Sequence, residues 1–600
     1  MLSKTDYIIW RDCHKNAWLK VHKPEIYRAH TLSAFELQII ETGNEVDLLA
    51  RDLFPTGEYQ KRFETDGYLA ITDILTEKDG EFNIYEVKAT NDIDKKTHLH
   101  DLTFQYIVLK RAGLNIKSAN LVHLNSEYVR QGELDITQLF MIEDMTETVE
   151  EMAEEVFAEM QLAKEYLESE TEPVGPCDCL KKGRSAHCTT FSYSNPGVPE
   201  YGIHDLTRIG LSKRKLTELV DSNIFKLEDI PEALELSDVQ KNQVWTYLTG
   251  REIISKENIS EELDKLVFPL YFLDYETFPA AIPRFDGFSP YNQIPFQYSL
   301  HILSSPEEKI EHVDFLYSHS EDPSRSFVES LQGHIEPKGS IVVWHKDFEC
   351  GRNRELAKRI PESKSFFDNI ETRIFDLEII FKKQQYVHKD FKGSSSIKKV
   401  LPVLVPQLSY KDLEIKEGGA ASIIWGQMTE PGSLFSEEEK LVVIENLKTY
   451  CKLDTYAMYA IWASLYQLIT GKTLSAQNAA LKEYSEEVAK KYLADELIFT
   501  WSDFEQQVIP GLVMRQATKS GLDISLEIAI SKMNLSQKID YYTKIGGDKN
   551  LARDVREVNE KRNKIYHAAS VEGREKTYQR TGEVIKVTNE LKSRIQGKFD

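Results

Sequence analysis

The sequence predicts a multidomain α/β protein whose last part is entirely helical. Two stretches, residues 67–90 and 270–278, have the pattern of strands, and helical spacing follows each of them. Beyond residue 475 only helical patterns remain. A chain of 600 residues also exceeds the size of about 250 to 300 residues at which single hydrophobic cores stop growing, so several domains are expected.

We expect four domains. Residues 1–195 form an α/β core with a cysteine cluster, 196–262 a helical connector, 263–475 a second α/β domain and 476–600 an all-α domain. An acidic stretch, residues 143–172, separates the first core from the cysteines and is expected to be a solvated helix.

An acidic pair lies within the strand pattern of the second α/β domain. In YFLDYETF, residues 271–278, the period of two places Asp274 and Glu276 side by side on one face of an apolar strand. Unpaired charges buried there would be costly. Mg²⁺ or Mn²⁺ removes this cost, because hard cations take carboxylate oxygens and can polarise a phosphate while activating a water molecule. The pair therefore predicts a divalent metal site.

Further acids follow downstream. Glu349 comes after the apolar run 341–344, with Asp347 as a rival ligand. Tyr450 and Asp454 are four residues apart in a helical pattern and therefore share a face. We expect Tyr450 to orient the water molecule that Asp454 helps to bind.

This ordered set resembles the DEDD exonucleases of the ribonuclease-H-like fold, in the subgroup with a tyrosine before the final aspartate. The resemblance implies Asp274 and Glu276 as the first motif, Glu349 as the second, and Tyr450 with Asp454 as the third. Glu349 departs from the pattern, because the second motif normally offers aspartate. The implied activity is two-metal hydrolysis of phosphodiester bonds, 3′ to 5′ on single strands.

A second grouping lies near the N-terminus. Residues 67–90 have the pattern of a β-hairpin with a turn at 78–80. We expect Asp73 to end the first strand, and Glu86 and Lys88 to share one face of the second. Asp73 and Glu86 can hold a divalent cation while the Lys88 ammonium supports the attacking water or the developing phosphate charge.

This grouping resembles the PD-(D/E)XK nuclease core, specifically its RecB-type branch. Gln105 stands in a following helix where that branch carries a glutamine, and Leu109 replaces the tyrosine expected four residues later. Asp47 or Glu45 stands where many relatives use histidine. Most of the stretch 1–470 also resembles an uncharacterised bacterial family in which an exonuclease-like domain follows a RecB-type domain.

Cysteine usage points to a metal centre. The chain has six cysteines, no signal-peptide pattern and no apolar run of membrane-spanning length, so we expect a cytoplasmic protein without structural disulfides. Clustered thiolates in such a chain are expected to bind zinc or an iron–sulfur cluster. The expected ligands are Cys13, Cys177, Cys179 and Cys188.

One cysteine before the hairpin and three after it resemble the iron–sulfur variant of RecB-type nucleases. The resemblance implies a 4Fe–4S cluster that joins the chain ends of the first domain. Zinc, with His187 assisting, is the alternative. Cys350 and Cys451 are expected to be small core residues.

Basic residues occur at two further places. The connector resembles helix-hairpin-helix modules, and its basic run 213–215 is expected to be a solvated face, with DNA contact as the alternative. After Gly393 and three serines, Lys398 and Lys399 are expected to bind the backbone of a nucleic acid.

The last of the expected C-terminal helices contains the segment KRNKIYH. Arg562 and His567 with the intervening Asn563 resemble the R-N-x-x-x-H element of HEPN domains. The resemblance implies a homodimer in which these side chains cleave RNA without a metal, one stabilising phosphate charge and the other moving a proton.

The charge balance limits the functional classes. With 74 basic and 97 acidic residues the net charge is −23, which argues against an extended basic surface for nucleic acid. Affinity for long duplexes should be modest and salt-sensitive, with strand ends, a guide or a partner protein of a defence system supplying the targeting.

The leading hypothesis is a metal-dependent nuclease of DNA or RNA in phage defence or DNA repair, without membrane association. The alternative is a pair of inactive nuclease folds that bind nucleic acid for a HEPN ribonuclease. A third class is a structural assembly protein that cleaves nothing.

Overall fold

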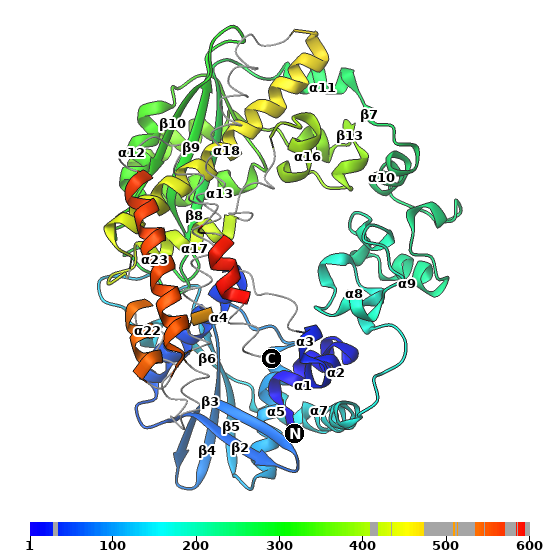
Figure 1. Ribbon diagram of the computed structural model, residues 1–600, viewed down its shortest axis with the longest axis vertical. Helices are drawn as coiled ribbons and strands as arrows, with labels where there is room; N and C mark the ends of the chain where they lie inside the picture. The colour runs from blue at the N-terminus through cyan, green and yellow to red at the C-terminus, as the bar shows by residue number, and fades with distance from the viewer. Residues whose placement is uncertain are drawn as a thin grey trace.

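The computed structural model describes residues 1–27, 34–408, 418–433 and 435–472 and, farther along, segments that include 535–544 and 547–569. It confirms the α/β multidomain class: two large β-sheets are found in the described residues, each covered by helices, and the C-terminal segments are helical. In Figure 1 the N-terminal sheet lies below the second sheet, and a helical arm runs along the right-hand side between them.

The first sheet contains the expected hairpin. Its order is β1 (Leu2–Ser3), β3 (Tyr68–Lys78), β4 (Glu81–Lys88), β5 (Ile116–Leu124) and β6 (Phe140–Asp144), with β2 (Glu58–Thr65) paired to β3. At the hairpin turn Asp79 and Gly80 both have positive φ, which matches the twist of the two strands. Asp73 lies in the middle of β3 and not at its end as expected, because pairing with β4 continues to Lys78.

Helices cover both faces of this sheet. On one face lie α1 (Lys4–Asp12), α2 (His14–His22), α5 (His98–Arg111) and α7 (Thr146–Glu168), whose side chains form one core with the strands. On the other lies α4 (Ala34–Ala50). The expected acidic helix is α7, but it begins later than predicted, because residues 143 and 144 belong to β6.

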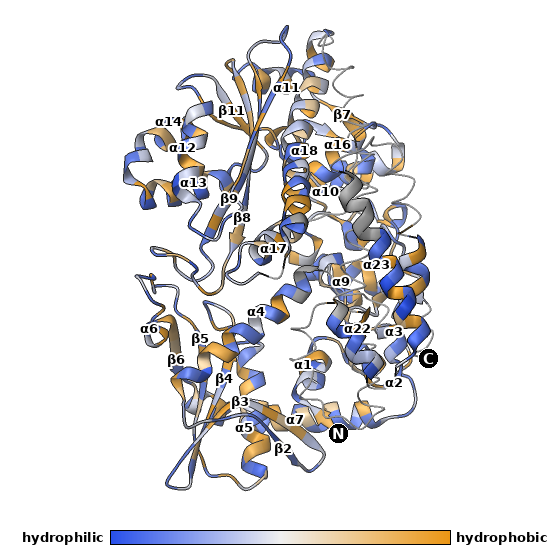
Figure 2. Cartoon of the chain, turned by 60° about the vertical axis from the view of Figure 1, so that its left-hand side comes forward, coloured by the Kyte–Doolittle hydropathy of each residue, from blue (hydrophilic) through white to orange (hydrophobic). Residues whose placement is uncertain are grey.

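The second sheet is mixed. Its order is β10 (Glu311–Leu316), β9 (Gln293–Leu303), β8 (Leu270–Pro279), β11 (Ser340–Val343) and β12 (Ile374–Asp376). The central strand β8 is antiparallel to β9 and parallel to β11. One face packs against α12 (Ser324–His334) and α13 (Asp347–Arg359), the other against α18 (Glu437–Thr470). Figure 2 shows apolar residues along the middle of α18, where it crosses the sheet.

The connector contacts the second domain through a strand pair and a helix. It contains α9 (Lys213–Asp221), α10 (Asp238–Thr249), β7 (Ile253–Ile254) and α11 (Lys256–Leu263). β7 pairs with β13 (Tyr386–Val387), and α11 packs against α18.

The two α/β domains also touch directly. Ala281 and Ile282 join the apolar cluster beneath α4, and the Tyr291 hydroxyl donates to the Ala89 carbonyl at 2.5 Å. One Arg130 nitrogen donates to the Pro283 carbonyl at 2.9 Å. These contacts hold the edges of the two domains together.

The described C-terminal segments include α22 (Leu535–Lys544) and α23 (Lys549–Ala569), which pack against each other. Arg562, Asn563 and His567 fall within α23, but their side chains lie outside the described residues. In the part of the chain that the structure describes, no helix has both the length and the apolar character needed to cross a bilayer.

Candidate functional site

Acidic side chains meet between β8 and α18. One carboxylate oxygen each from Asp274 and Glu276 and the sulfur of Cys451 lie within 4.8 Å of one another. Burial, followed by the charges of Asp454 and Glu276, raises the pKa of Asp274 well above its usual range. Burial and then Asp454 raise the pKa of Glu276 in the same way. Strand β8 and helix α18 thus place three acids in one electrostatic environment.

Glu349 adds a fourth carboxylate from the first turn of α13. Its side chain is buried, at 2 % exposure, and among the described residues its Oε2 atom has no hydrogen-bond partner. Burial, with a contribution from Asp376, raises its pKa to about 8. Its charge also raises the pKa of Asp274, whereas Asp347 is exposed. The geometry therefore favours Glu349 over Asp347 as the inward-facing acid.

Tyr450 lies against the same group of acids. The ring is buried, and burial followed by the charges of Asp454 and Glu276 raises the pKa of its hydroxyl well above the usual range. The hydroxyl therefore stays protonated at neutral pH and remains available as a hydrogen-bond donor.

Strand β9 fixes α18 in place. Ser299, which pairs with Asp274 across the strands, shares a 2.7 Å hydrogen bond with Thr455, next to Asp454. Gln297, which pairs with Glu276, donates to the Leu447 carbonyl at 2.8 Å. Each member of the acidic pair on β8 therefore has a neighbour that holds the opposing helix.

Two members of this site were not expected from the sequence. Cys451 is buried as predicted, but it also contacts the acids: its sulfur lies 3.9 Å from an Asp274 carboxylate oxygen. Burial and then Asp274 raise its pKa well above normal, so it stays a thiol. Asp376, at the end of β12, is near enough to Glu349 to affect its pKa. The sequence signal for Asp376 is its place directly after the apolar residues Ile374 and Phe375.

Lys398 and Lys399, the two lysines expected to bind nucleic acid, differ in their surroundings. Both belong to α16 (Ile397–Leu404). Lys398 is close enough to Glu276 for its charge to lower that carboxyl's pKa, against the larger effect of burial. Lys399 is exposed. Only Lys398 is therefore placed beside the acids.

The donor set suits a hard divalent cation. Asp274, Glu276, Glu349 and Asp454 offer carboxylate oxygens, which Mg²⁺ and Mn²⁺ prefer. Buried acids that repel one another require protons or cations, and the unpartnered Oε2 atom of Glu349 has a lone pair to give. These residues therefore fit a divalent metal.

The raised pKa values predict how stability depends on pH without added metal. Glu349 binds its proton up to about pH 8 in the native state but only to about pH 4.3 when unfolded, so the native state holds more protons between these values. Stability then falls as pH rises through this window. We expect the Tm of the protein to drop by a few degrees between about pH 5 and pH 8. Glu349→Gln should flatten this drop, and added Mg²⁺ should raise Tm more at the higher pH; an identical slope in the variant would contradict the burial of this acid.

The structure also brings together the N-terminal residues that the sequence singled out, Asp73, Glu86, Lys88 and Gln105. Lys88 forms a 2.6 Å ion pair with Glu86, and the Gln105 amide donates to the other Glu86 oxygen. Asp73 accepts a 2.9 Å hydrogen bond from the backbone of Val87. Burial, followed by the charge of Glu86, raises the pKa of Asp73 to about 8.

The structure distinguishes Asp47 from Glu45, the two acids expected where many RecB-type nucleases use histidine. Gln60 donates to both Asp47 and Asp73, and the charge of Asp47 adds to the raised pKa of Asp73. Glu45 instead faces the second domain, where Glu430 and Arg284 influence its pKa after burial. Asp47 is therefore the member that borders this site.

Lys4 and Asp101 complete the site unexpectedly. Lys4 lies 2.7 Å from Glu86 and 3.2 Å from Asp101, and Lys88 binds the same two carboxylates. Although burial opposes it, these two ammonium groups lower the pKa of Glu86 well below its usual range. Glu86 is thus already paired with two cationic side chains. Asp101 stands four residues before Gln105 on α5, so the sequence spacing alone could have placed both on the same helix face. No spacing in the sequence connects Lys4 with this site.

Lys4→Met is expected to destabilise the first domain. The Lys4 side chain is 22 % exposed and Glu86 2 %, so part of the pairing is screened by water, and Lys88 remains as a second partner. We expect the free energy of unfolding of the first domain to fall by about 1 to 2 kcal/mol, which lowers its Tm by roughly 2 to 6 °C. Lys61→Met, which removes an exposed pair with Glu58, is the matched control and should change Tm by less than about 1 °C. Equal effects in the two variants would contradict the role assigned to Lys4.

The four expected cysteines converge. The sulfurs of Cys13, Cys177, Cys179 and Cys188 all lie within 4.8 Å of one another, and none forms a disulfide. Cys13 lies between α1 and α2, whereas the other three follow α7, so the cluster joins the two ends of the first domain. This group can bind a metal ion or an iron–sulfur cluster.

Hydrogen bonds within the cluster favour the thiolate form of Cys177 and the neutral thiol form of Cys13 and Cys188. Hydrogen bonds from Cys13 and other thiols, with one of 3.2 Å from the Asn195 amide, lower the pKa of Cys177. His187 is turned elsewhere: its Nε2 atom lies 3.1 Å from the Lys182 carbonyl, and its ring stacks on Phe191. The sulfur cluster is therefore built without His187.

Comparison with known proteins gives a match within the second domain. Residues 271–396 match the model of a family described as a domain of unknown function, DUF2779. This stretch contains Asp274, Glu276 and Glu349, while Tyr450 and Asp454 lie beyond it. No curated protein and no solved structure matches the chain.

Proposed function

We propose that the protein is a metal-dependent nuclease whose active centre is the acidic group between β8 and α18. The observation that carries the proposal is the convergence of four carboxylates from β8, α13 and α18: Asp274 and Glu276 lie within 4.8 Å of each other, and the charges of Glu276, Glu349 and Asp454 all raise the pKa of Asp274. Clustered carboxylates of this kind hold the two divalent cations of many phosphoryl-transfer enzymes. When bound, Mg²⁺ or Mn²⁺ would polarise the phosphate and supply a water nucleophile.

The remaining side chains suit this reaction. Tyr450 keeps its proton and can orient a water molecule among the acids, and Lys398 can bind a phosphate oxygen beside Glu276. The acidic pair on the central strand of a mixed sheet supports the resemblance to DEDD exonucleases with tyrosine. We therefore propose 3′ to 5′ hydrolysis of single strands, in phage defence or DNA repair.

A specific observation favours a second role for the first domain. Lys4 and Lys88 together neutralise Glu86 and Asp101, so a cation entering there must compete with two ammonium groups. We propose that this RecB-like domain binds nucleic acid and that its cleavage activity is weaker than that of the Asp274 site.

The sulfur separations bear on the metal of the cysteine cluster. Cys13 and Cys188 lie 3.8 Å apart, and Cys177 and Cys188 3.9 Å. Zinc–thiolate bonds of about 2.3 Å in a tetrahedron place the sulfurs about 3.8 Å apart. In a 4Fe–4S cluster each thiolate binds a different iron atom, which requires wider spacing. The distances support a single tetrahedral ion such as zinc, and a brown protein absorbing near about 400 nm after anaerobic purification would instead support the cluster.

One experiment tests the proposed activity. End-labelled DNA and RNA are incubated with Mn²⁺ and the parent protein, or with the Asp274→Asn, Asp73→Ala and His567→Ala variants. Loss of cleavage in Asp274→Asn, with cleavage retained in the other two, supports the proposal. Metal-independent RNA cleavage that disappears in His567→Ala would support the HEPN alternative, with the protein acting as a dimer. No cleavage in any condition would overturn both.

A further inference from the structure

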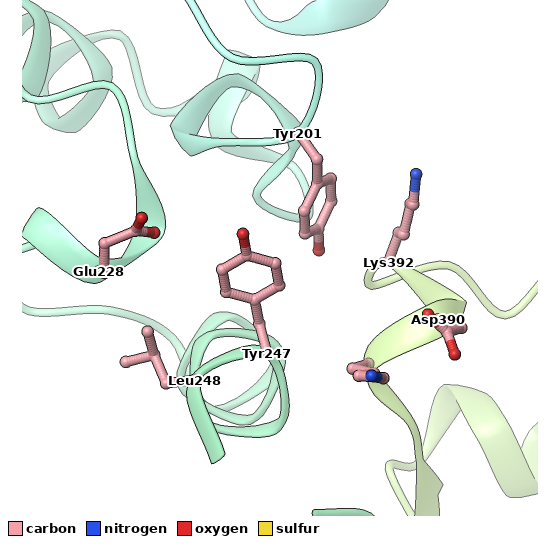
Figure 3. A pocket seen from close by; sticks show the side chains of 7 residues that line it. Tyr201, Glu228, Tyr247, Leu248, Asp390 and Lys392 are labelled. Carbon is pink, nitrogen blue, oxygen red and sulfur yellow. The ribbon is translucent and has the colours of Figure 1, made fainter. Parts of the chain in front are cut away.

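A pocket of about 490 Å³ lies where the connector meets the second α/β domain. The connector contributes Tyr201, Glu228 and Tyr247, and the segment around η8 (Lys389–Phe391) contributes two lysines and Asp390. In Figure 3 the Tyr201 and Tyr247 side chains lie near each other at the centre, with Lys392 and Glu228 on opposite sides. The pocket thus combines aromatic rings with charges of both signs.

A buried amide fixes the walls of the pocket. Gln243, on α10, donates to the Tyr201 hydroxyl at 2.8 Å and to the Lys392 carbonyl at 3.2 Å, and accepts from the Thr207 backbone at 2.9 Å. Gly393 has a φ of +75°, and a Cβ atom there would lie 2.5 Å from Gln243 and from Thr207. With the pairing of β7 and β13 nearby, these contacts hold both sides of the pocket in a preformed arrangement.

The lining has the chemistry of a nucleotide site. The Tyr201 and Tyr247 rings lie 5.5 Å apart at a tilt of 58°, and the Tyr247 residue is 38 % exposed, so part of it is accessible to a ligand. Nucleobases stack on such rings regardless of sequence. Lys389 and Lys392 are both exposed, and the Lys392 ammonium lies over the Tyr201 ring, 5.3 Å from its centroid. Two ammonium groups beside the rings suit the phosphates of a strand whose base stacks there. Glu228 can accept from a base amino group.

The backbone connects this pocket to the acidic site. Lys392 precedes Lys398 by six residues, which bounds their Cα separation at about 20 Å. Lys398 in turn lies beside Glu276. We infer that the pocket binds an internal nucleotide of a single-stranded nucleic acid whose end enters the acidic site. This inference rests on the nuclease proposed above and names how its substrate is held.

Binding measurements separate this inference from catalysis. Fluorescence anisotropy of a labelled single-stranded oligonucleotide is recorded with full-length protein in the Asp274→Asn background, without added Mg²⁺ or Mn²⁺. Adding Tyr247→Ala should weaken binding on the order of 10-fold, and Tyr247→Phe should restore it. Adding Lys392→Ala should lower the slope of log affinity against log salt by about 0.7. Lys241→Ala, an exposed change on the same helix outside the pocket, should leave affinity within about twofold.

The outcomes are distinct. Binding that is unchanged by Tyr247→Ala and Lys392→Ala, or absent in the parent, overturns the pocket and leaves the nuclease proposal to its own test. Complete displacement of the strand by an equal concentration of mononucleotide overturns strand binding in favour of a free nucleotide. Weakened binding in the pocket variants, in a protein that cleaves nothing with Mn²⁺, would keep the pocket as a strand site and reject the nuclease.

Discussion

Asp274→Asn is expected to reduce metal-dependent hydrolysis by at least about 10³-fold. The amide keeps the shape of the side chain but removes one negative charge from the group that would hold the metal. The loss of a ligand charge at a metal that stabilises the transition state removes several kcal/mol, and about 4 kcal/mol corresponds to three powers of ten in rate. Initial rates on a 5′-labelled single strand across a range of Mn²⁺ concentrations measure the effect.

The same substitution should leave the fold intact. The pKa of Asp274 is raised because burial and three like charges disfavour its ionised form. A neutral amide removes that repulsion, so Tm without added metal should stay the same or rise at about pH 8. A large loss of Tm together with activity would mean that the carboxylate is structural, and would remove the support for a catalytic role.

Asp347→Asn is the matched control. Asp347 is the nearby acid that the sequence alone could not separate from Glu349, and its side chain is exposed. The variant should keep activity within about twofold, since surface charges away from special features have small effects. Activity lost equally in Asp347→Asn and Asp274→Asn would contradict the geometry described for α13.

Some of this site follows from local periodicity. Alternation along β8 places Asp274 and Glu276 on one face, and the four-residue spacing on α18 places Tyr450 beside Asp454. Both placements follow from the side-chain periods of a strand and a helix, without any information on tertiary contacts. The choice between Asp347 and Glu349 required tertiary structure, because both stand in the first turn of α13 and only packing decides which side chain is buried.

Other features arise from contacts that have no local signature. Lys4 follows a two-residue strand and reaches Glu86 only because β1 pairs with β3. The pocket beside Tyr247 exists because a connector helix and the segment after β13 share the Gln243 amide. The sequence correctly predicted that Cys451 is a buried core residue, but it did not indicate that the sulfur contacts Asp274. Long-range pairing produces each of these arrangements, and sequence spacing does not encode it.

Cys179→Ser is expected to abolish binding of the metal proposed for the cysteine cluster and to unfold much of the first domain. Cys179 is fully buried and its sulfur is one of four within 4.8 Å. Structural zinc contributes about 10 to 16 kcal/mol of binding free energy at pH 7, and this becomes folding free energy when the site forms only in the native state. The loss of about 4 kcal/mol or more would lower Tm by roughly 10 °C. Elemental analysis of the purified protein and thermal unfolding measure the two effects.

The position of the cluster explains why the effect should be large. Cys13 holds the junction of α1 and α2, and the other three sulfurs hold the chain after α7, so the site closes a loop that spans the whole first domain. Without a bound ion, nothing would join these four sulfurs, and the two ends of the domain would lose this connection. Cys350→Ser, at a cysteine outside the cluster, should retain the metal and lower Tm by only about 1 to 3 °C. Full metal content in Cys179→Ser would show that the ligands lie elsewhere, whereas loss of metal with an unchanged Tm would show that the site is not structural.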